Sequence, residues 1–176
     1  MKEQQALYLD DYVKTVSPKP PHEFWSNEVA LMQSLKLKST QQQVHFVTTH
    51  LLGHPAKRHV RDWQAQVITD WAMTLCSPSD PLVICGDMNA APDSDLYSNF
   101  NSGGFSSGYA SVFGSEPPVT FLTETIRGTM DYMFLKGPIR ATAGVKIDTP
   151  AAALPSGSSG SDHLPLILDI TYNITE

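Results

Sequence analysis

The sequence predicts an α/β fold in which short strands form a sheet and one long amphipathic helix packs against it. Two observations carry this prediction. Apolar residues recur at helical spacing through residues 60–75, and several other apolar or alternating segments have the length of strands. With 176 residues, 41% of them hydrophobic, the chain can form one domain with its own core.

The start of the chain, residues 1–23, indicates a short helical piece followed by the Pro-rich stretch 17–21. Such a stretch is typical of a linker. We therefore expect residues 1–23 to lie outside the core and the folded domain to occupy residues 24–172. Within that domain, residues 29–37 and 44–51 indicate two paired strands joined by a polar, Gln-rich turn.

The apolar stripe of the next segment is typical of a helix that packs one face on a sheet. Its members are Val60, Trp63, Val67, Ile68, Trp71, Ala72 and Leu75. Residues 82–85 then form an apolar run suited to a buried strand, and residues 128–135 alternate as a strand does. The intervening residues 92–119 are rich in Gly, Ser and Pro, so we expect a loop with one short helix near residues 96–100.

The segment 82–89 contains the first candidate for a functional site. Its apolar run ends abruptly in Gly86, followed by Asp87 and Asn89. Asp87 can hold a metal ion or take a proton from water, and Asn89 can donate to an oxyanion without adding charge. The alternative is structural, namely an Asx-type turn that caps the strand end.

Two further acids stand at the ends of predicted strands. Asp131 lies near the start of the strand 128–135, and Asp162 and His163 precede the apolar run 164–168. Each has a structural alternative: Asp131 can be satisfied by nearby backbone amides, and Asp162 with His163 can form a turn before the strand. Because the acids recur at strand ends, we interpret them together with Asp87 as parts of one site.

These motifs resemble a known family. Gly86-Asp87-Met88-Asn89, Gly128-Thr129-Met130-Asp131-Tyr132 and Ser161-Asp162-His163 look, in this order, like the C-terminal motifs of the endonuclease/exonuclease/phosphatase superfamily of metal-dependent phosphoesterases. A second set is similar to the branch that contains the deadenylases, nocturnin, angel and 2'-phosphodiesterase. This set comprises residues 27–32, Val47-Thr48-Thr49-His50-Leu51, His54-Pro55, Arg61, Gln64, Thr120 and Thr123.

The resemblance implies an α/β (α+β) sandwich of two packed, mostly antiparallel sheets flanked by helices. It runs from about residue 24 to residue 170, and it makes residues 24–172 the C-terminal part of such a domain. The N-terminal half of the family domain carries an Asn at a strand end and a Glu that is the principal magnesium ligand. Neither is visible in this sequence, so we expect the chain to supply about the C-terminal half of the fold.

The resemblance also implies the roles of the site residues. Asp87 would orient or deprotonate the attacking water, and Asn89 would bond a phosphate oxygen of the substrate. Asp131 would orient His163, whose imidazole would donate to the nonbridging oxygens. Asp162 and Asp87 would lie at a Mg²⁺ ion, with Mn²⁺ as the alternative.

Three more polar residues complete the predicted site. His50 caps a buried strand, and we expect it in the site because acids at neighbouring strand ends are its best partners. Its alternative is a bond to those acids with no further role. Arg58 and Arg61 belong to a cationic cluster that either faces substrate phosphates or forms a solvated helix start.

Charge and composition restrict the function classes. With a net charge of -6, the chain lacks the broad positively charged surface that is expected of a protein that binds duplex nucleic acid tightly and without sequence preference. The two cysteines form no Cys-x-x-Cys motif, and the sequence has neither a secretory segment nor an apolar run that could cross a bilayer. We expect a soluble protein of the cytoplasm or nucleus that has no membrane contact.

The function that the resemblance implies is that of a Mg-dependent phosphodiesterase. Such an enzyme would act as a poly(A) deadenylase-like exoribonuclease at RNA 3' ends, or on a nucleotide-derived substrate. The alternative is a catalytically incomplete fragment or isoform that lacks the metal-binding half. A small-molecule phosphatase or a sphingomyelinase-like phosphodiesterase of the same superfamily is the weaker alternative, because the segment from His50 to Gln64 resembles the deadenylase branch.

Overall fold

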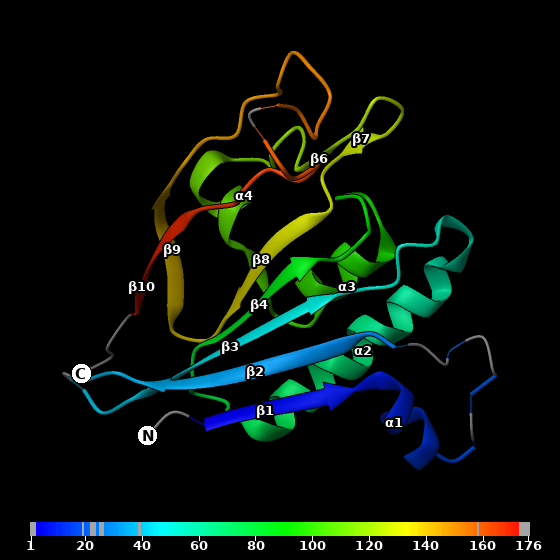
Figure 1. The fold of residues 1–176 in the computed structure, drawn as a ribbon. Helices are drawn as coiled ribbons and strands as arrows, with labels where there is room; N and C mark the ends of the chain where they lie inside the picture. Colours follow the sequence, from blue (N-terminus) through cyan, green and yellow to red (C-terminus); the bar gives the residue numbers. More distant parts are fainter. Residues whose placement is uncertain are drawn as a thin grey trace.

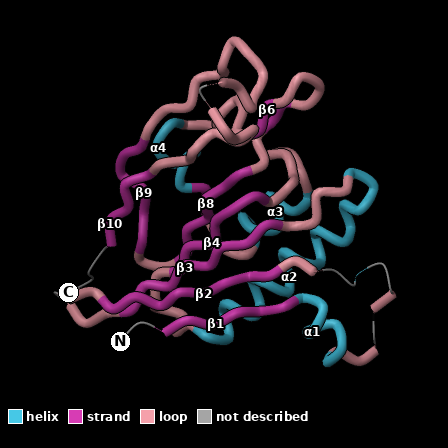
Figure 2. Tube along the Cα trace, viewed as in Figure 1, coloured by secondary structure: helices cyan, strands magenta, loops and turns pink. Residues whose placement is uncertain are grey.

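The centre of the molecule is a six-stranded sheet with the strand order β1-β2-β3-β4-β8-β5 (Figures 1 and 2). The computed structural model describes residues 3–18, 20–21, 24, 27–38, 40–157 and 159–172. The strands of this sheet are β1 (Glu3–Tyr8), β2 (Val29–Lys36), β3 (Gln43–His50), β4 (Leu82–Asp87), β5 (Ser106–Ser107) and β8 (Asp131–Lys136). Strands β3 and β4 pair in parallel, and the other neighbours pair antiparallel.

Two smaller sheets lie beside the large one. Strand β9 (Ile139–Gly144) pairs with β10 (Leu168–Tyr172), and β6 (Phe121–Leu122) pairs with β7 (Arg127–Gly128). The helical elements are α1 (Leu9–Thr15), η2 (Pro55–Lys57), α2 (Arg58–Leu75), α3 (Asp95–Ser102) and α4 (Gly108–Phe113). The expected α/β fold of mostly antiparallel sheets flanked by helices is confirmed.

Helices α2 and α3 cover one face of the large sheet, and α1 follows the end of β1 at the edge of the sheet (Figure 1). Helix α2 provides the crossover that a parallel pair such as β3 and β4 requires. The main core lies between these helices and the sheet, and it includes Met32, Val47, Ile68, Ile84 and Phe134. A smaller apolar cluster around Val44, Val83, Leu135 and Ile139 involves the opposite face of the sheet and strand β9.

The predicted helix at residues 60–75 is confirmed, but its buried stripe differs from the predicted one. Arg61 and Gln64 are buried, whereas Trp63 and Trp71 are only partly buried at the edge of the core. Leu75 is exposed. The stripe differs because Trp63 packs against the rings of Tyr12 and Phe24, at centroid distances of 6.3 Å and 5.3 Å, while Arg61 and Gln64 turn toward the segment after β3.

The N-terminal segment differs more strongly from the prediction. We expected residues 1–23 to lie outside the core, yet β1 is the edge strand of the large sheet and pairs with β2 from Glu3 to Tyr8. Leu9 and Val13 on helix α1 are buried. Local sequence hid this strand because its Gln-rich residues alternate weakly, and its partner strand lies more than 20 residues further along the chain. Lys19, His22 and Glu23 lie outside the described residues.

The stretch 92–119 contains more regular structure than the single short helix that we expected. Ser94 caps α3 by accepting from the backbone N–H of Tyr97, and Ser107 caps α4 by accepting from that of Ala110. Phe100 on α3 stacks on Phe134 of β8 at a centroid distance of 4.2 Å. The Ser-rich composition therefore marks helix starts rather than an extended loop. No helix within the described ranges is long and apolar enough to cross a membrane.

Candidate active site

Neighbouring strands bring three predicted site residues into one row. His50 is paired with Asp87 in the register of β3 and β4, and Asp87 is paired with Asp131 in the register of β4 and β8. Side chains at paired positions on adjacent strands point to the same face of a sheet. The row therefore places an imidazole and two carboxylates side by side at one end of the sheet.

His163 joins this row from the loop that precedes β10. Its Nδ1 lies 2.9 Å from Asp131 Oδ2, and its Nε2 lies 3.8 Å from Asp87 Oδ2. On the other side, His50 Nε2 lies 3.4 Å from the same Oδ2 of Asp87. Asp87 is thus flanked by two imidazoles, and Asp131 holds one of them.

The local structure around Asp87 explains the Gly-Asp-x-Asn motif. Gly86 has a φ of +132°, and a Cβ at this position would lie 1.9 Å from the carbonyl oxygen of Thr49, so only glycine fits. Asn89 has a φ of +48°, and its backbone N–H donates to Asp87 Oδ1 over 2.8 Å. The Asx-type turn that we considered as a structural alternative is present, and it also fixes one carboxylate oxygen of Asp87.

The threonine that precedes β6, Thr120, positions Asp131. Its buried hydroxyl accepts from the backbone N–H of Met130 over 2.9 Å and from that of Asp131 over 3.0 Å. Its carbonyl accepts from the N–H of Leu164 over 2.8 Å. Thr120 therefore ties the start of β8 to the loop that carries His163, which sets the distance between the two side chains.

The electrostatics of the site follow from burial and from the paired acids. Burial raises the pKa of Asp87 and the charge of Asp131 adds to this rise, while the N–H of Asn89 and the two histidines oppose it. Burial disfavours the imidazolium of His163, but the hydrogen bond and charge of Asp131 outweigh burial, so the pKa of His163 is raised. Asp87 is therefore inclined to accept a proton, and His163 is inclined to hold one.

A divalent cation fits the donor set of this site. Ligand atoms from Asp87, Asp131 and His163 all lie within 4.8 Å of one another. Carboxylate oxygens suit Mg²⁺ and Mn²⁺, so Asp87 and Asp131 fit such an ion, and His163 would join them only with a neutral imidazole. Asp162, which we predicted as a ligand, lies outside this group, and its carbonyl accepts from the N–H of Leu122. A ligand role for Asp162 stays a prediction.

The two predicted substrate-binding arginines have different surroundings. Arg58 is exposed and pairs with the exposed Asp95 at 2.9 Å. Arg61 is only 7% exposed, and its guanidinium donates to backbone carbonyls of the segment after β3. Sequence reasoning did not foresee the buried position of Arg61 or that of Gln64. Arg61 and Gln64 lie one and four residues after Val60, on the same face of the helix, and this spacing is the feature of the sequence that indicates their burial.

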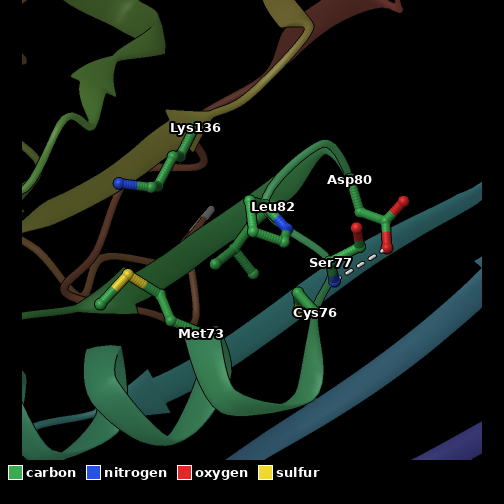
Figure 3. Close-up of a pocket in the computed structure, with 7 residues that line it drawn as sticks. Met73, Cys76, Ser77, Asp80, Leu82 and Lys136 are labelled. Atoms are coloured by element: carbon green, nitrogen blue, oxygen red, sulfur yellow. Dashed lines mark hydrogen bonds between the residues drawn. The ribbon is translucent and has the colours of Figure 1, made fainter.

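Two hollows of the surface differ in their relation to the site. One of about 440 Å³ adjoins it, lined by Asn27, Glu28, Val29, His50, Leu51 and Gly53. The other, of about 270 Å³, lies at the opposite end of β4 beside Met73, Cys76 and Leu82 (Figure 3). Asp80 in the second hollow accepts from the N–H of Ser77, and Lys136 donates to the carbonyl of Gly103. Both charged side chains of this hollow therefore already form hydrogen bonds within the protein.

Comparisons with known proteins agree with this geometry. A model of the Endonuclease/Exonuclease/phosphatase family matches residues 8–163. Nocturnin of Xenopus laevis is 31% identical over 163 residues, which cover 84% of this chain and 42% of that protein. The CCR4-Not complex 3'-5'-exoribonuclease subunit Ccr4 of Kluyveromyces lactis is 28% identical over 182 residues, which cover 80% of this chain and 23% of that protein.

Solved structures share the fold. The catalytic domain of human Nocturnin with a bound sulfate anion has a TM-score of 0.74 at 25% identity, over 97% of this chain and 59% of that one. ANGEL2, a 2',3'-cyclic phosphatase, in complex with adenosine-2',3'-vanadate, has a TM-score of 0.76 at 20% identity, over 96% of this chain and 66% of that one. The chain spans less than half the length of the curated relatives described above.

Proposed function

The chain belongs to the endonuclease/exonuclease/phosphatase family, and from that premise we propose that it forms the catalytic part of a metal-dependent phosphodiesterase. The substrate is RNA, shortened from its 3' end in the manner of a deadenylase, or a nucleotide-derived molecule. One observation carries the proposal: Asp87, Asp131 and His163 come from separate segments and converge at one end of the sheet. We infer that it acts in the cytoplasm or nucleus, where such substrates occur.

The chemistry follows from the charges of a phosphodiester. Water must approach a phosphorus shielded by anionic oxygens, so catalysis requires a base for the water and donors for the oxygens. Asp87 accepts the proton of the water, a role that its raised pKa favours. In its imidazolium form, which Asp131 favours, His163 donates to a nonbridging oxygen, and the side-chain amide of Asn89 donates to another.

A metal ion would be held by Asp87 together with Asp131 or Asp162. Bound Mg²⁺ or Mn²⁺ supplies positive charge that offsets the charge of the phosphate. His50 lies on the other side of Asp87 and is 72% exposed, so its imidazole can reach a substrate oxygen without leaving hydrogen-bonding range of that acid. We propose that Arg58, exposed beside Asp95, exchanges this partner for a phosphate further along the substrate.

The test is hydrolysis of a labelled oligoadenylate RNA with Mg²⁺, Mn²⁺ or EDTA. We expect turnover only with a divalent cation, and faster than nicking of duplex DNA at an abasic site. Asp87→Asn and His163→Ala should each lower kcat by about a hundredfold or more. Asp148→Asn, at an exposed position, is the control and should match the wild type. Unchanged turnover in both site variants would contradict the assigned roles, and a preference for the abasic DNA would contradict the substrate class.

A second candidate is a catalytically incomplete chain. It is favoured because, among the described residues, the group that could hold a metal ion contains Asp87, Asp131 and His163 and no Glu of the kind expected for the family. Two carboxylates facing each other bind a cation weakly unless further ligands complete the site. Titration calorimetry with Mg²⁺ separates the two candidates. Weak binding and no hydrolysis by the chain, with both restored when the upstream half of the domain is added, would establish incompleteness.

A third candidate is a phosphatase of the same family. ANGEL2 is described as a 2',3'-cyclic phosphatase, and its structure shares the fold of this chain. Hydrolysis of adenosine 2',3'-cyclic phosphate in the same assay, without shortening of oligoadenylate, would favour this candidate.

A further inference from the structure

The segment that follows β3, residues 51–54, is held by two polar side chains of α2. Arg61 Nη1 donates to the carbonyl of Leu52 over 3.2 Å and to that of His54 over 2.8 Å. Gln64 Oε1 accepts from the N–H of Leu52 over 3.0 Å. The two side chains stand three residues apart, on the same face of the helix. Helix α2 therefore fixes the backbone of the segment at several successive groups.

The same segment holds the side chain of Asn89. Asn89 Nδ2 donates to the carbonyl of Leu51 over 2.8 Å, and the N–H of Leu51 donates to the carbonyl of Asp87 over 2.9 Å. A Cβ built on Gly53 would lie 3.4 Å from Asn89 Oδ1, so the backbone of Gly53 packs beside the carboxamide. The orientation of this carboxamide thus depends on where residues 51–54 lie.

Burial of these two polar side chains costs desolvation that apolar residues at the same positions would not cost. Gln64 is fully buried and Arg61 nearly so, on a stripe where the neighbouring positions are apolar. Burial lowers the pKa of Arg61, whose hydrogen bonds go to carbonyls and whose Nε has no partner among the described residues. Packing of α2 on the sheet does not require a guanidinium and a carboxamide there, because leucine or methionine would fill the same space without that desolvation. The backbone groups that they bind do require them.

The other end of Gln64 reaches the opposite border of the site. Its Nε2 donates to Glu28 Oε2 over 3.2 Å, and Glu28 directly precedes β2. Glu28, Leu51 and Gly53 all line the hollow beside His50. Gln64 therefore connects the segment before β2 with the segment after β3, at the place where a substrate would approach Asn89.

On the basis of the proposed function, we propose that Gln64 and Arg61 are positioning residues for the reaction. They immobilise residues 51–54, and this segment in turn fixes the Asn89 carboxamide in the orientation that donates to the phosphate. Neither side chain touches the reacting atoms. Arg61 acts through the backbone carbonyls that it binds and not through a phosphate of the substrate.

Two substitutions at one position separate positioning from packing. Gln64→Met keeps the length and apolar contacts of the side chain but removes the acceptor for the N–H of Leu52. Gln64→Glu keeps that acceptor and gives up only the donor to Glu28. If Gln64 served packing alone, Gln64→Met would behave like the wild type and Gln64→Glu would not. The positioning role predicts the opposite: Gln64→Glu should behave like the wild type and Gln64→Met should not. Gln66→Met, on the exposed side of α2 where Gln66 bonds Asp70, is the control.

The first measurement is exchange of the Asn89 side-chain amide with water, followed by NMR in the 176-residue chain. We expect about tenfold faster exchange in Gln64→Met and near-wild-type exchange in Gln64→Glu and Gln66→Met. Backbone spectra check the fold of each variant. If Gln64→Met does not fold, Arg61→Met repeats the test, because a thioether has no N–H group to donate to the carbonyls of Leu52 and His54. Equal exchange in the wild type and in the variant that folds would overturn the proposal.

The second measurement is hydrolysis of oligoadenylate. We expect kcat to fall about tenfold or more in Gln64→Met while KM changes less than twofold, because Asn89 acts in the transition state. A rise in KM alone would overturn the positioning role. If the wild type hydrolyses no phosphodiester, the proposed function fails, and the exchange measurement still decides whether α2 orients Asn89.

Discussion

The hydroxyl of Thr120 offers a quantitative test of how the site is built. It is fully buried, and it accepts from two successive backbone N–H groups, those of Met130 and Asp131. Thr120→Val replaces the hydroxyl with a methyl group of similar size. The main-chain bonds from Thr120 N–H to Gly128 and from Leu164 N–H to Thr120 stay in place, so the substitution removes the hydroxyl alone.

The expected cost follows from the groups that lose their acceptor. A buried donor left without a partner costs about 1–3 kcal/mol, so two donors should lower the free energy of unfolding by about 2–6 kcal/mol. Urea denaturation followed by circular dichroism measures this loss. Thr142→Val is the control, because it makes the same chemical change at an exposed position of β9. The Oγ1 of Thr142 forms a long hydrogen bond, 3.4 Å, to the carbonyl of Asp169. We expect the control to change stability by less than about 0.5 kcal/mol.

A second measurement links Thr120 to the site. Because Asp131 raises the pKa of His163, a displaced Asp131 should lower that pKa, and NMR titration of the His163 ring follows the change. A Thr120→Val protein that loses less than about 0.5 kcal/mol and keeps the His163 titration unchanged would refute the reasoning that Thr120 positions Asp131.

Two further predictions concern pH. Burial raises the pKa of Cys76 from 9.0 to about 11, so at pH 8 its thiolate should be about a hundredfold scarcer than that of a cysteine in a free peptide. Its alkylation by iodoacetamide, followed by peptide mass spectrometry, should be about a hundredfold slower than that of the peptide. The raised pKa of His163 stabilises the folded state most fully below the pKa of an unfolded histidine, and this contribution disappears as pH rises through the folded value. In EDTA, the stability advantage of the wild type over His163→Gln should therefore shrink from pH 5.5 to pH 8.5. A pH-independent difference would contradict the pairing of His163 with Asp131.

Strong local patterns predicted much of the fold. The spacing of apolar residues located α2, and the short apolar runs located β2, β3, β4 and β8. The Gly-Asp-x-Asn motif was readable because Asn89 closes a local turn on Asp87, and because only glycine can pass Thr49 of the neighbouring strand as closely as Gly86 does. These features depend on residues that are near in sequence or on a steric requirement that only one residue type meets.

The sequence by itself determined which side chains can carry the chemistry and at which strand ends they stand. Only the tertiary structure decided how they meet. His163 reaches Asp131 across 32 residues, and Asn89 reaches Leu51 across 38. It also decided that β1 joins the sheet and that Arg61 binds carbonyls in the interior instead of facing solvent. Contacts of this kind depend on strand register and on the packing of α2 against the sheet, which local periodicity does not encode, because each residue's partner is chosen by the whole fold.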